Sequence, residues 1–487
     1  MKHLAERHVP MNSSLSDNTN NPVPNETPGI SFSALALQDT LLSNLASLGY
    51  EQMTPIQAHG LPIMLDGKDV IAEAKTGSGK TAAFGLAVLN RLVVSHFAVQ
   101  ALILCPTREL AEQVSQALRR LARLMPNVKV LNVSGGMPIK PQVESLKHGT
   151  HIIVGTPGRV QKHIDQGTLT LNDLQMLVLD EADRMLDMGF FDAIKNVIKH
   201  CPKKRQTWLF SATYPKEIKV LATQFMMNPE RLVIEDAHTE LDIVQNFYEV
   251  TYQSNKYAVL KAVLLHYQPS STLVFCNTKE QTTQLVDVLV KEGFSAIALN
   301  GDMEQIERDV AMIRFVNQSA SILVATDVAA RGLDIKELPM VINFDVAHAF
   351  DIHVHRIGRT GRAGSKGLAL SITTPADAER LLAIEAGQGA ALSWATVSAL
   401  TSSNSSLLAP SMAPLCLSAG RKDKIRPGDV LGALTKDAGL PASAIGKIDV
   451  TALYSYVAIS QSEIDKAYRY LQQGKLKGRK VSVKKLR

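Results

Sequence analysis

Residues 74–81 read Ala74-Lys75-Thr76-Gly77-Ser78-Gly79-Lys80-Thr81. An apolar run at 69–72 precedes them and a helical pattern rich in Ala, Leu and Val follows, which predicts a strand, a glycine loop and a helix. The N–H groups of such a loop converge on an anion, where Lys80 can reach the β- and γ-phosphates and the Thr81 hydroxyl can hold Mg²⁺. The usual pattern begins with Gly where this chain has Ala74, so the stretch alone also fits an ordinary strand-to-helix turn.

Length and composition indicate several folded domains. At 487 residues the chain is too long for one hydrophobic core, and its 45% hydrophobic and 20% charged content is typical of soluble globular proteins. No apolar run approaches the roughly 18 residues that span a bilayer. The N-terminus lacks the apolar segment of a signal peptide, and the four cysteines are far apart, as in a reducing compartment. We expect a cytoplasmic monomer without a membrane partner.

Positive charge is concentrated at the C-terminus. Residues 415–487 hold 15 Lys and Arg against 6 Asp and Glu, a net charge of +9, whereas the remainder carries −3. A solvated basic surface is one explanation. An excess this concentrated more often indicates an anionic partner such as nucleic acid.

Short continuous apolar runs alternate with helical patterns along most of the chain, which is typical of parallel strands buried on both faces. The runs form two sets, at 69–72, 101–105, 151–154, 176–179 and 207–210, and at 272–275, 297–299, 322–325, 340–343 and 368–372. Two successive α/β sheets are therefore predicted. A helix is expected to begin with Thr54 as its N-cap and Pro55 as its first residue.

Composition sets the expected domain boundaries. Residues 1–29 are rich in Asn, Ser and Pro and are expected to be disordered. The two α/β domains are expected at 30–237 and 238–392, followed by a Ser-rich linker at 393–414. A small domain at 415–487 is expected to contain strand, helix, strand, helix and strand.

Asp180-Glu181-Ala182-Asp183 follows directly after the apolar run Met176-Leu177-Val178-Leu179. Ligands of open α/β sheets bind at the carboxyl ends of the strands. An Asp there can hold Mg²⁺, and a neighbouring Glu can deprotonate the attacking water. An acidic helix start is the plainer alternative.

These four residues resemble the signature of the DEAD-box RNA helicases, and further motifs stand in that family's order over about residues 30–390. They are Phe32, Gly49-Tyr50 and Thr54-Pro55-Ile56-Gln57, then Pro106-Thr107-Arg108-Glu109-Leu110, Gly135-Gly136, Thr156-Pro157-Gly158-Arg159 and Ser211-Ala212-Thr213, then Phe275-Cys276-Asn277-Thr278, Gln305, Arg308, Ala325-Thr326-Asp327, Arg331-Gly332-Leu333-Asp334 and His355 to Arg362. The resemblance implies an α/β fold with two tandem RecA-like domains, the helicase superfamily 2 core, followed by a small α+β domain similar to an RRM.

The resemblance also implies roles for single residues. ATP and Mg²⁺ are the implied cofactors, and the implied nucleotide contacts are Phe32, Tyr50, Gln57, Thr76, Gly77, Ser78, Gly79, Lys80, Thr81 and Asp334. Thr81 and Asp180 would hold the metal, and the implied catalytic set is Lys80, Asp180, Glu181, Arg359 and Arg362. Arg359 and Arg362 would neutralise charge on the γ-phosphate. Hydrolysis would be coupled to strand separation by Asp183, Ser211, Thr213 and His355.

RNA is the implied partner of both α/β domains and of the tail. The implied contacts of the α/β domains are Pro106, Thr107, Arg108, Gly136, Thr156, Arg159, Thr278, Arg308 and Thr326. Backbone contacts carry no sequence information. The tail resembles that of a bacterial branch of the family that docks on a 23S ribosomal RNA hairpin near the peptidyl-transferase centre, in precursors of the large ribosomal subunit. Its candidate contacts are Arg421, Lys422, Lys424, Arg426, Lys447, Lys475, Lys477 and Arg479.

Two points stay open at this stage. Tyr454 and Tyr456 alternate along one predicted strand and so share a face, where they can stack on bases or pack in the core. For the whole chain, the motifs predict an ATP-dependent RNA helicase that remodels ribosomal RNA. An ATP-gated RNA clamp that does little unwinding carries the same motifs, and a DNA helicase is a weaker third interpretation.

Overall fold

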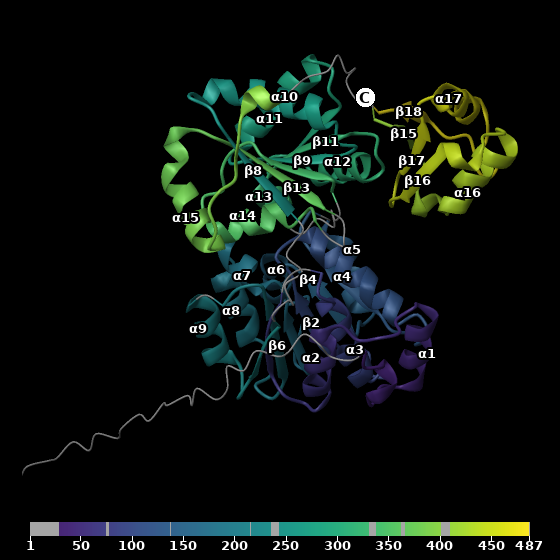
Figure 1. The fold of residues 1–487 in the computed structure, drawn as a ribbon. Helices are drawn as coiled ribbons and strands as arrows, with labels where there is room; N and C mark the ends of the chain where they lie inside the picture. Colours follow the sequence, from purple (N-terminus) through teal and green to yellow (C-terminus); the bar gives the residue numbers. More distant parts are fainter. Residues whose placement is uncertain are drawn as a thin grey trace, which may run out of the picture. The chain divides into compact units, whose positions relative to one another are not determined.

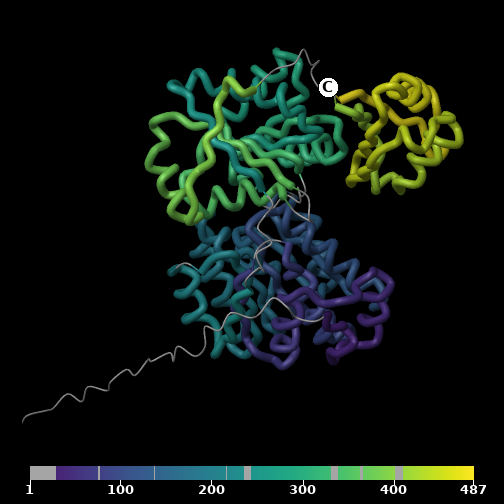
Figure 2. The backbone as a smooth tube through the Cα atoms, viewed as in Figure 1, coloured from purple at the N-terminus to yellow at the C-terminus, as the bar shows by residue number. Residues whose placement is uncertain are grey.

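The structure is a computed structural model that describes residues 29–74, 77–136, 138–214, 216–234, 243–330, 338–361, 366–400 and 410–486. The chain divides into two compact units, Met1–Ala237 and His238–Arg487. We call 29–234 the first domain, 243–400 the second domain and 410–486 the C-terminal domain. Each is built on its own sheet, and each can be followed by colour in Figure 2. No helix in these ranges is long and apolar enough to cross a bilayer.

The first domain is a parallel sheet with helices on both faces (Figure 1). Its strand order is β3-β4-β2-β5-β6-β1-β7. The strands are β1 (Val70–Glu73), β2 (Ala101–Leu104), β3 (Val130–Val133), β4 (Ile152–Gly155), β5 (Met176–Leu179), β6 (Gln206–Ser211) and β7 (Glu230–Val233). The helices are α1 (Asp39–Ser47), α2 (Pro55–Leu65), α3 (Lys80–Arg91), α4 (Arg108–Leu121), α5 (Ile139–Lys147), α6 (Pro157–Asp165), α7 (Ala182–Asp187), α8 (Phe191–Lys199) and α9 (Lys216–Phe225).

The core of the first domain explains its continuous apolar strands. Side chains from α1 to α4 pack on one face of the sheet, and side chains from α6 to α9 pack on the other. Neighbouring residues of one strand, such as Leu102 and Ile103 in β2, therefore enter different cores and are both fully buried. This arrangement leaves the loops at the carboxyl edge for polar residues.

The second domain repeats this architecture in the order β10-β11-β9-β12-β13-β8-β14. Helices α10 and α11 pack on one face, and α12, α13 and α15 contribute to cores on the other. The strands are β8 (Ile243–Glu249), β9 (Thr272–Cys276), β10 (Ala296–Leu299), β11 (Ile322–Thr326), β12 (Met340–Asn343), β13 (Gly367–Thr373) and β14 (Trp394–Ala395). The helices are α10 (Lys256–Tyr267), α11 (Lys279–Lys291), α12 (Gln305–Val316), α13 (Asp327–Ala330), α14 (Phe350–Ile357) and α15 (Ala378–Gln388).

The C-terminal domain is a four-stranded antiparallel sheet in the order β16-β17-β15-β18, with two helices packed on one face. Its elements are β15 (Met412–Leu417), α16 (Pro427–Gly432), β16 (Ile445–Val450), β17 (Ser455–Ser460), α17 (Ile464–Gln473) and β18 (Val483–Lys485). Val457 and Ile459 of β17 point into the core with the helices. Tyr456 alternates with them and lies opposite Cys416 and Asp449, outside that core, and Tyr454 is also outside it.

The predicted fold class is confirmed, with two parallel seven-stranded sheets followed by a small antiparallel domain. The helix that begins at Pro55 with Thr54 as N-cap is also present. In the first and second domains, four strands were not predicted. Three of them, β3, β7 and β14, lie at sheet edges, and the fourth, β8, carries several polar residues. The predicted linker, 393–414, is shorter in the structure, since β14 pairs with β8 and β15 begins at Met412.

The tail also differs from its predicted order of strand, helix, strand, helix and strand. Two strands, β16 and β17, follow α16 in place of one. The predicted strand that carries Tyr454 and Tyr456 corresponds to β17, and β16, which is half-buried at the edge of the sheet, was not predicted. Residues 1–28 of the predicted N-terminal extension lie outside the described residues.

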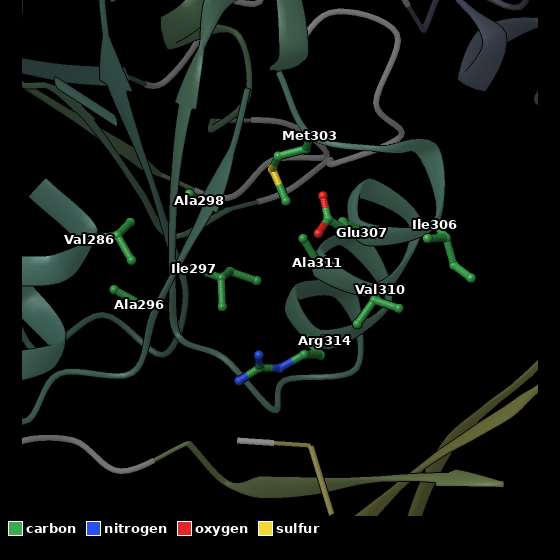
Figure 3. A pocket seen from close by; sticks show the side chains of 10 residues that line it. All are labelled: Val286, Ala296, Ile297, Ala298, Met303, Ile306, Glu307, Val310, Ala311 and Arg314. Atoms are coloured by element: carbon green, nitrogen blue, oxygen red, sulfur yellow. The ribbon is translucent and has the colours of Figure 1, made fainter. Parts of the chain in front are cut away.

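A pocket of about 400 Å³ lies in the second domain between β10 and α12. Figure 3 shows Ile297 of β10 facing α12, with Met303 and Glu307 at one end of the pocket and Arg314 at the other. The remaining lining residues are apolar. None of these lining residues belongs to the described parts of the loops at the carboxyl ends of β9, β11 and β12.

The environment of His353 predicts acid sensitivity of the second domain. Its Nε2 donates to Gln245 Oε1 at 2.9 Å, its ring stacks on Phe247, and Phe247 contacts Trp394. Burial, with the nearby charge of Arg356, lowers the pKa of His353 from 6.5 to about 4. The unfolded chain binds this proton first as the pH falls, so stability should fall between pH 6.5 and 4, by at most about 3 kcal/mol.

Fluorine NMR of 5-fluorotryptophan-labelled protein measures this loss directly. The chain has two tryptophans, Trp208 in the first sheet and Trp394 in the second, so each domain reports on itself. The Trp394 signal should show unfolding at lower denaturant as the pH falls, and His353→Gln should weaken that dependence. Equal pH dependence in both proteins would exclude His353 as its source.

Candidate functional site

The glycine loop joins β1 to α3, and Gly79 is the N-cap of that helix. Gly77 and Gly79 have φ angles of 93° and 95°, a left-handed conformation that favours glycine. Lys80 is buried, and its Nζ donates to Ala74 O at 2.7 Å. Ser78 Oγ is buried and has no hydrogen-bond partner within the described chain. The loop is therefore folded around a lysine, with polar groups left for an anion.

The residues predicted to read adenine lie next to this loop. Gln57 is buried in the first turn of α2, where its Oε1 accepts from Thr54 N at 2.9 Å. Its Nε2 donates to Gly79 O at 3.1 Å, which ties this helix to the glycine loop. The rings of Phe32 and Tyr50 meet edge to face at 6.2 Å. The structure thus brings Gln57 to the loop and Phe32 to Tyr50.

The acidic motif follows β5, two strands away from β1 in the sheet. Glu181 has a φ of 52°, unusual for a residue with a side chain, and its Oε2 accepts from Arg184 Nη1 at 2.7 Å. Burial, together with the carboxylate of Glu181, raises the pKa of Asp180 to about 7 against the attraction of Lys80. Asp180 Oδ1 is buried and has no hydrogen-bond partner within the described ranges. A buried carboxylate oxygen beside Lys80, near the start of α3 where Thr81 lies, fits a divalent cation.

Asp183 joins the acidic motif to the loop after β6. Its Oδ2 accepts from Ala212 N at 3.0 Å, Thr213 N at 3.0 Å and Thr213 Oγ1 at 3.1 Å. Its own N–H donates to Ser211 Oγ at 3.3 Å. In the sheet, β6 lies between β5 and β1. A shift of the loop after β5 therefore also displaces the loop after β6. This geometry is what a coupling role for Asp183, Ser211 and Thr213 requires.

The other half of the same sheet edge carries the predicted RNA contacts. Pro106, Thr107 and Arg108 follow β2, Gly136 follows β3, and Thr156 and Arg159 follow β4. The side chain of Arg108 lies against Gly135 and Gly136, where a Cβ on Gly136 would come within 2.2 Å of Nη1. Burial, with the nearby charge of Arg108, lowers the pKa of Arg159. Two guanidinium groups held this close favour binding of an anion between them.

Gln142 of α5, which the sequence did not single out, organises this half. Its Oε1 accepts from Arg159 Nε at 2.8 Å, and its Nε2 donates to Ser134 O at 3.1 Å. No local pattern distinguishes this glutamine from other polar helix residues. Its role follows only from the packing of α5 against the loops after β3 and β4.

In the second domain the predicted contacts follow three neighbouring strands. Thr278 follows β9 and caps α11, Arg308 lies in the first turns of α12 after β10, and Thr326 ends β11. His355 lies in α14, and Arg359 is buried just beyond it. Thr76, Asp334 and Arg362 lie outside the described residues.

Arg356 links these loops, although no separate role was predicted for it. Its Nε and Nη2 donate to the two carboxylate oxygens of Asp327 at 2.6 and 2.8 Å. It also donates to Asn277 Oδ1 and to Asp345 O. Lys256, fully buried, donates to Phe344 O at 3.0 Å. Together these two cations hold the loops after β9, β11 and β12.

Most of the basic residues predicted in the tail lie in two loops of the C-terminal domain. Arg421, Lys422, Lys424 and Arg426 precede α16, and Lys475, Lys477 and Arg479 follow α17. Lys447 lies apart in β16 and pairs with Asp449 at 3.3 Å.

Gly79→Ala should weaken ATP binding about tenfold or more. At this φ of 95° a Cβ would lie 2.6 Å from Gln57 Nε2 and 2.7 Å from Thr54 Oγ1, so the loop and Gln57 have to separate. Gly67→Ala is the matched control: its φ is 93°, but its Cβ would meet Arg91 at an ordinary 3.6 Å. Both variants carry the backbone cost of about 1–2 kcal/mol. Titration with a fluorescent ATP analogue should separate them, and equal affinities would contradict the assigned role of this contact.

Comparison with known protein families gives three matches along the chain. Residues 54–221 match the DEAD/DEAH box helicase family, 255–364 match the helicase conserved C-terminal domain, and 414–485 match the DbpA RNA binding domain. The ATP-dependent RNA helicase DbpA of Escherichia coli is 50% identical over 94% of this chain and 99% of its own. The helicase CshA of Limosilactobacillus reuteri is 44% identical over 73% of this chain and 71% of its own.

Solved structures give the same result for the α/β domains. Dbp5 of S. cerevisiae bound to RNA and ADP BeF3 is 30% identical, covers 75% of this chain and 96% of its own, and has a TM-score of 0.68. The glycine loop and the acidic motif are thus found in a chain that matches E. coli DbpA over 94% of its length. The chain belongs to the DEAD-box ATP-dependent RNA helicases and carries a DbpA-type RNA-binding domain.

Proposed function

We propose that this helicase uses ATP hydrolysis to open local duplexes in 23S ribosomal RNA during assembly of the large ribosomal subunit. The C-terminal domain carries the proposal, because the motifs of the α/β domains contact the RNA backbone and so select no sequence. Its residues 414–485 match the DbpA RNA binding domain, and the whole chain is half identical to E. coli DbpA. Cytoplasmic action on precursor particles follows from the same proposal.

Two basic loops of the C-terminal domain form one surface in this account. Lys477 Nζ donates to Lys424 O at 2.9 Å and pairs with Asp429 at 3.4 Å. Arg479 lies 3.8 Å from Asp423. These contacts join residues 421–429 to residues 475–480, about fifty positions further along the chain. Lys477 and Arg479 therefore help to hold the loops together, and the other basic side chains remain for a ligand.

The charge of this surface suits a nucleic acid. The two loops contain eight Lys and Arg against two Asp. Arg421, Lys422, Lys424, Arg426, Lys475 and Lys480 are exposed, and none of them makes an ion pair within the described part of the domain. Cations that no carboxylate neutralises attract phosphates and release counterions on binding. A folded RNA hairpin that presents phosphates from both strands is a suitable ligand.

For the ATPase we propose that Lys80 binds the phosphates and that Glu181 accepts the proton of the attacking water. Asp180 and Thr81 are suited to hold Mg²⁺, which would neutralise charge on the phosphate oxygens. The tie between Asp183 and the loop after β6 is suited to pass the state of the site toward the RNA side of the sheet. The roles of Asp334, Arg359 and Arg362 toward ATP and of His355 in coupling stay predictions.

Glu181→Gln should leave ATP affinity nearly unchanged and lower RNA-stimulated turnover by about 100-fold or more, as expected for loss of a general base. The amide keeps the size of the side chain but no longer takes up a proton. Single-turnover hydrolysis and a separate ATP titration measure the two effects. Normal turnover in this variant would remove Glu181 from the base role.

Charge reversal in the basic loops tests the proposed RNA surface. Lys422→Glu and Lys475→Glu should each weaken binding to a 23S fragment with the hairpin and lower the salt dependence of binding by about one phosphate contact. Lys436→Glu is the control, because Lys436 is also exposed but lies beyond the C-terminal end of α16. Fluorescence anisotropy at several salt concentrations measures both quantities. Equal weakening in all three variants would mean that charge alone, and not this surface, governs binding.

Unwinding itself is tested by strand displacement. A duplex placed beside the hairpin should be separated in the presence of ATP, and a duplex of the same sequence without the hairpin should be separated more slowly. A protein that binds the first substrate tightly in ATP but leaves it paired would be a clamp, and the proposed remodelling role would fail.

A further inference from the structure

We infer that Arg184 is a positioning residue for Glu181, fixing the carboxylate so that one chosen oxygen takes the proton of the attacking water. The inference rests on the proposed role of Glu181 as the base. Arg184 Nη1 donates to Glu181 Oε2 at 2.7 Å, and the exposed fractions of the two side chains are 4% and 7%. Neither the strand pattern nor the acidic motif pointed to this arginine.

The pair is fixed from several sides. Glu181 has a left-handed backbone conformation, with φ 52° and ψ 54°, at the point where β5 ends and α7 begins. Three residues later, the N–H of Arg184 donates to Asp183 Oδ1 at 3.0 Å. The other oxygen of Asp183 is held by Ala212 and Thr213. Arg184 is therefore anchored through its backbone to the coupling network and through its side chain to Glu181.

This arrangement distinguishes the two oxygens of Glu181. Oε2 is occupied by a charge-assisted hydrogen bond, so we assign the attacking water to Oε1. In hydrolysis the water oxygen bonds to the γ-phosphorus as the bond from phosphorus to the β–γ bridging oxygen breaks. The electrons of that bond stay with ADP, and the water proton moves to Oε1. Arg184 holds Oε2 throughout the step, so the carboxylate does not turn away when it is neutralised.

Because the Arg184–Glu181 pair is buried, the distance and direction of its hydrogen bond matter. A buried carboxylate without its partner loses a charged hydrogen bond that water cannot replace, and it adopts other rotamers. The planar guanidinium sets both the distance and the direction of the bond, whereas a lysine supplies charge alone. We therefore expect Arg184→Met, which keeps length but removes charge, to act on the chemical step.

Single-turnover hydrolysis at saturating RNA, with a parallel ATP titration, is the test in the full chain. Arg184→Met should lower the rate constant about 100-fold with ATP affinity within about twofold, the size expected from a misplaced catalytic group. Arg184→Lys should recover part of that loss, to about tenfold below the unmodified protein. An Arg184→Met rate within twofold of the unmodified protein would overturn the inference.

A control variant separates positioning from a loss of folding. Arg205→Met removes a half-buried guanidinium at the amino-terminal edge of the same sheet, where Arg205 donates to Pro202 O and Phe225 O. It should lower thermal stability without changing the hydrolysis rate per ATP bound. An equal loss of rate in Arg205→Met and Arg184→Met would overturn the inference, because instability alone would then explain both.

Combination with Glu181→Gln distinguishes this inference from the proposed function. If Arg184 acts through Glu181, then Glu181→Gln/Arg184→Met should hydrolyse ATP as slowly as Glu181→Gln and no more slowly. A further tenfold fall in the double variant would show that Arg184 acts independently, and the inference would fail while Glu181 remained the base. Normal turnover in Glu181→Gln alone would overturn the base role and this inference together.

Discussion

Burial of charge at the carboxyl edge of the first sheet is the constraint on which the site depends. Lys80, Asp180, Glu181, Asp183 and Arg184 are all nearly inaccessible to water. Charged groups out of water need partners, and four of these five find them within the protein, at Ala74 O, in the Glu181–Arg184 pair and around Asp183. Asp180 retains an oxygen that has no hydrogen-bond partner among the described residues, and its pKa is raised to about 7. Most of the buried charges at this edge are thus balanced within the protein. The position beside Asp180 suits a cation and a triphosphate.

The same edge divides into two halves with different chemistry. In one half, the buried carboxylate of Asp183 joins the loops after β5 and β6, and Asp180 interacts with Lys80 at the start of α3, which suits a reaction that moves charge. Gln142 joins the loops after β3 and β4, and Arg108 and Arg159 line this half of the edge, which suits a phosphate backbone. The two halves share a continuous sheet because β5 pairs with β2. At the end of this pairing, Asp180 N donates to Leu104 O. In the second domain, Arg356 and Lys256 hold the loops together, as buried carboxylates do in the first domain.

The sequence predicted the parts of this site that depend on local order. The glycine loop and the acidic motif each follow an apolar strand, so both can be recognised from neighbouring residues. Both lie at the carboxyl edge of the parallel sheet, as predicted. Partners that come from distant segments were not predictable, since nothing near Gln142 or Lys256 indicates which loop each will hold. Edge strands such as β3 and β7 were missed for a related reason: they bury less apolar surface and so lack continuous hydrophobicity. In the tail, β16 was missed because it lies at the sheet edge, half-buried, and includes polar residues such as Lys447 and Asp449.

The central claim is that the C-terminal domain directs a general RNA motor to one site. The most direct test is the ATPase rate without RNA, with unstructured RNA and with a 23S fragment that carries the hairpin, for the full chain and for a chain ending at Ala409. The shortened protein keeps both α/β domains, each with its own sheet and core, so it is expected to fold. The account predicts that the 23S fragment stimulates the full chain about tenfold more than unstructured RNA and that truncation removes this preference. Equal stimulation of both proteins by every RNA would contradict it.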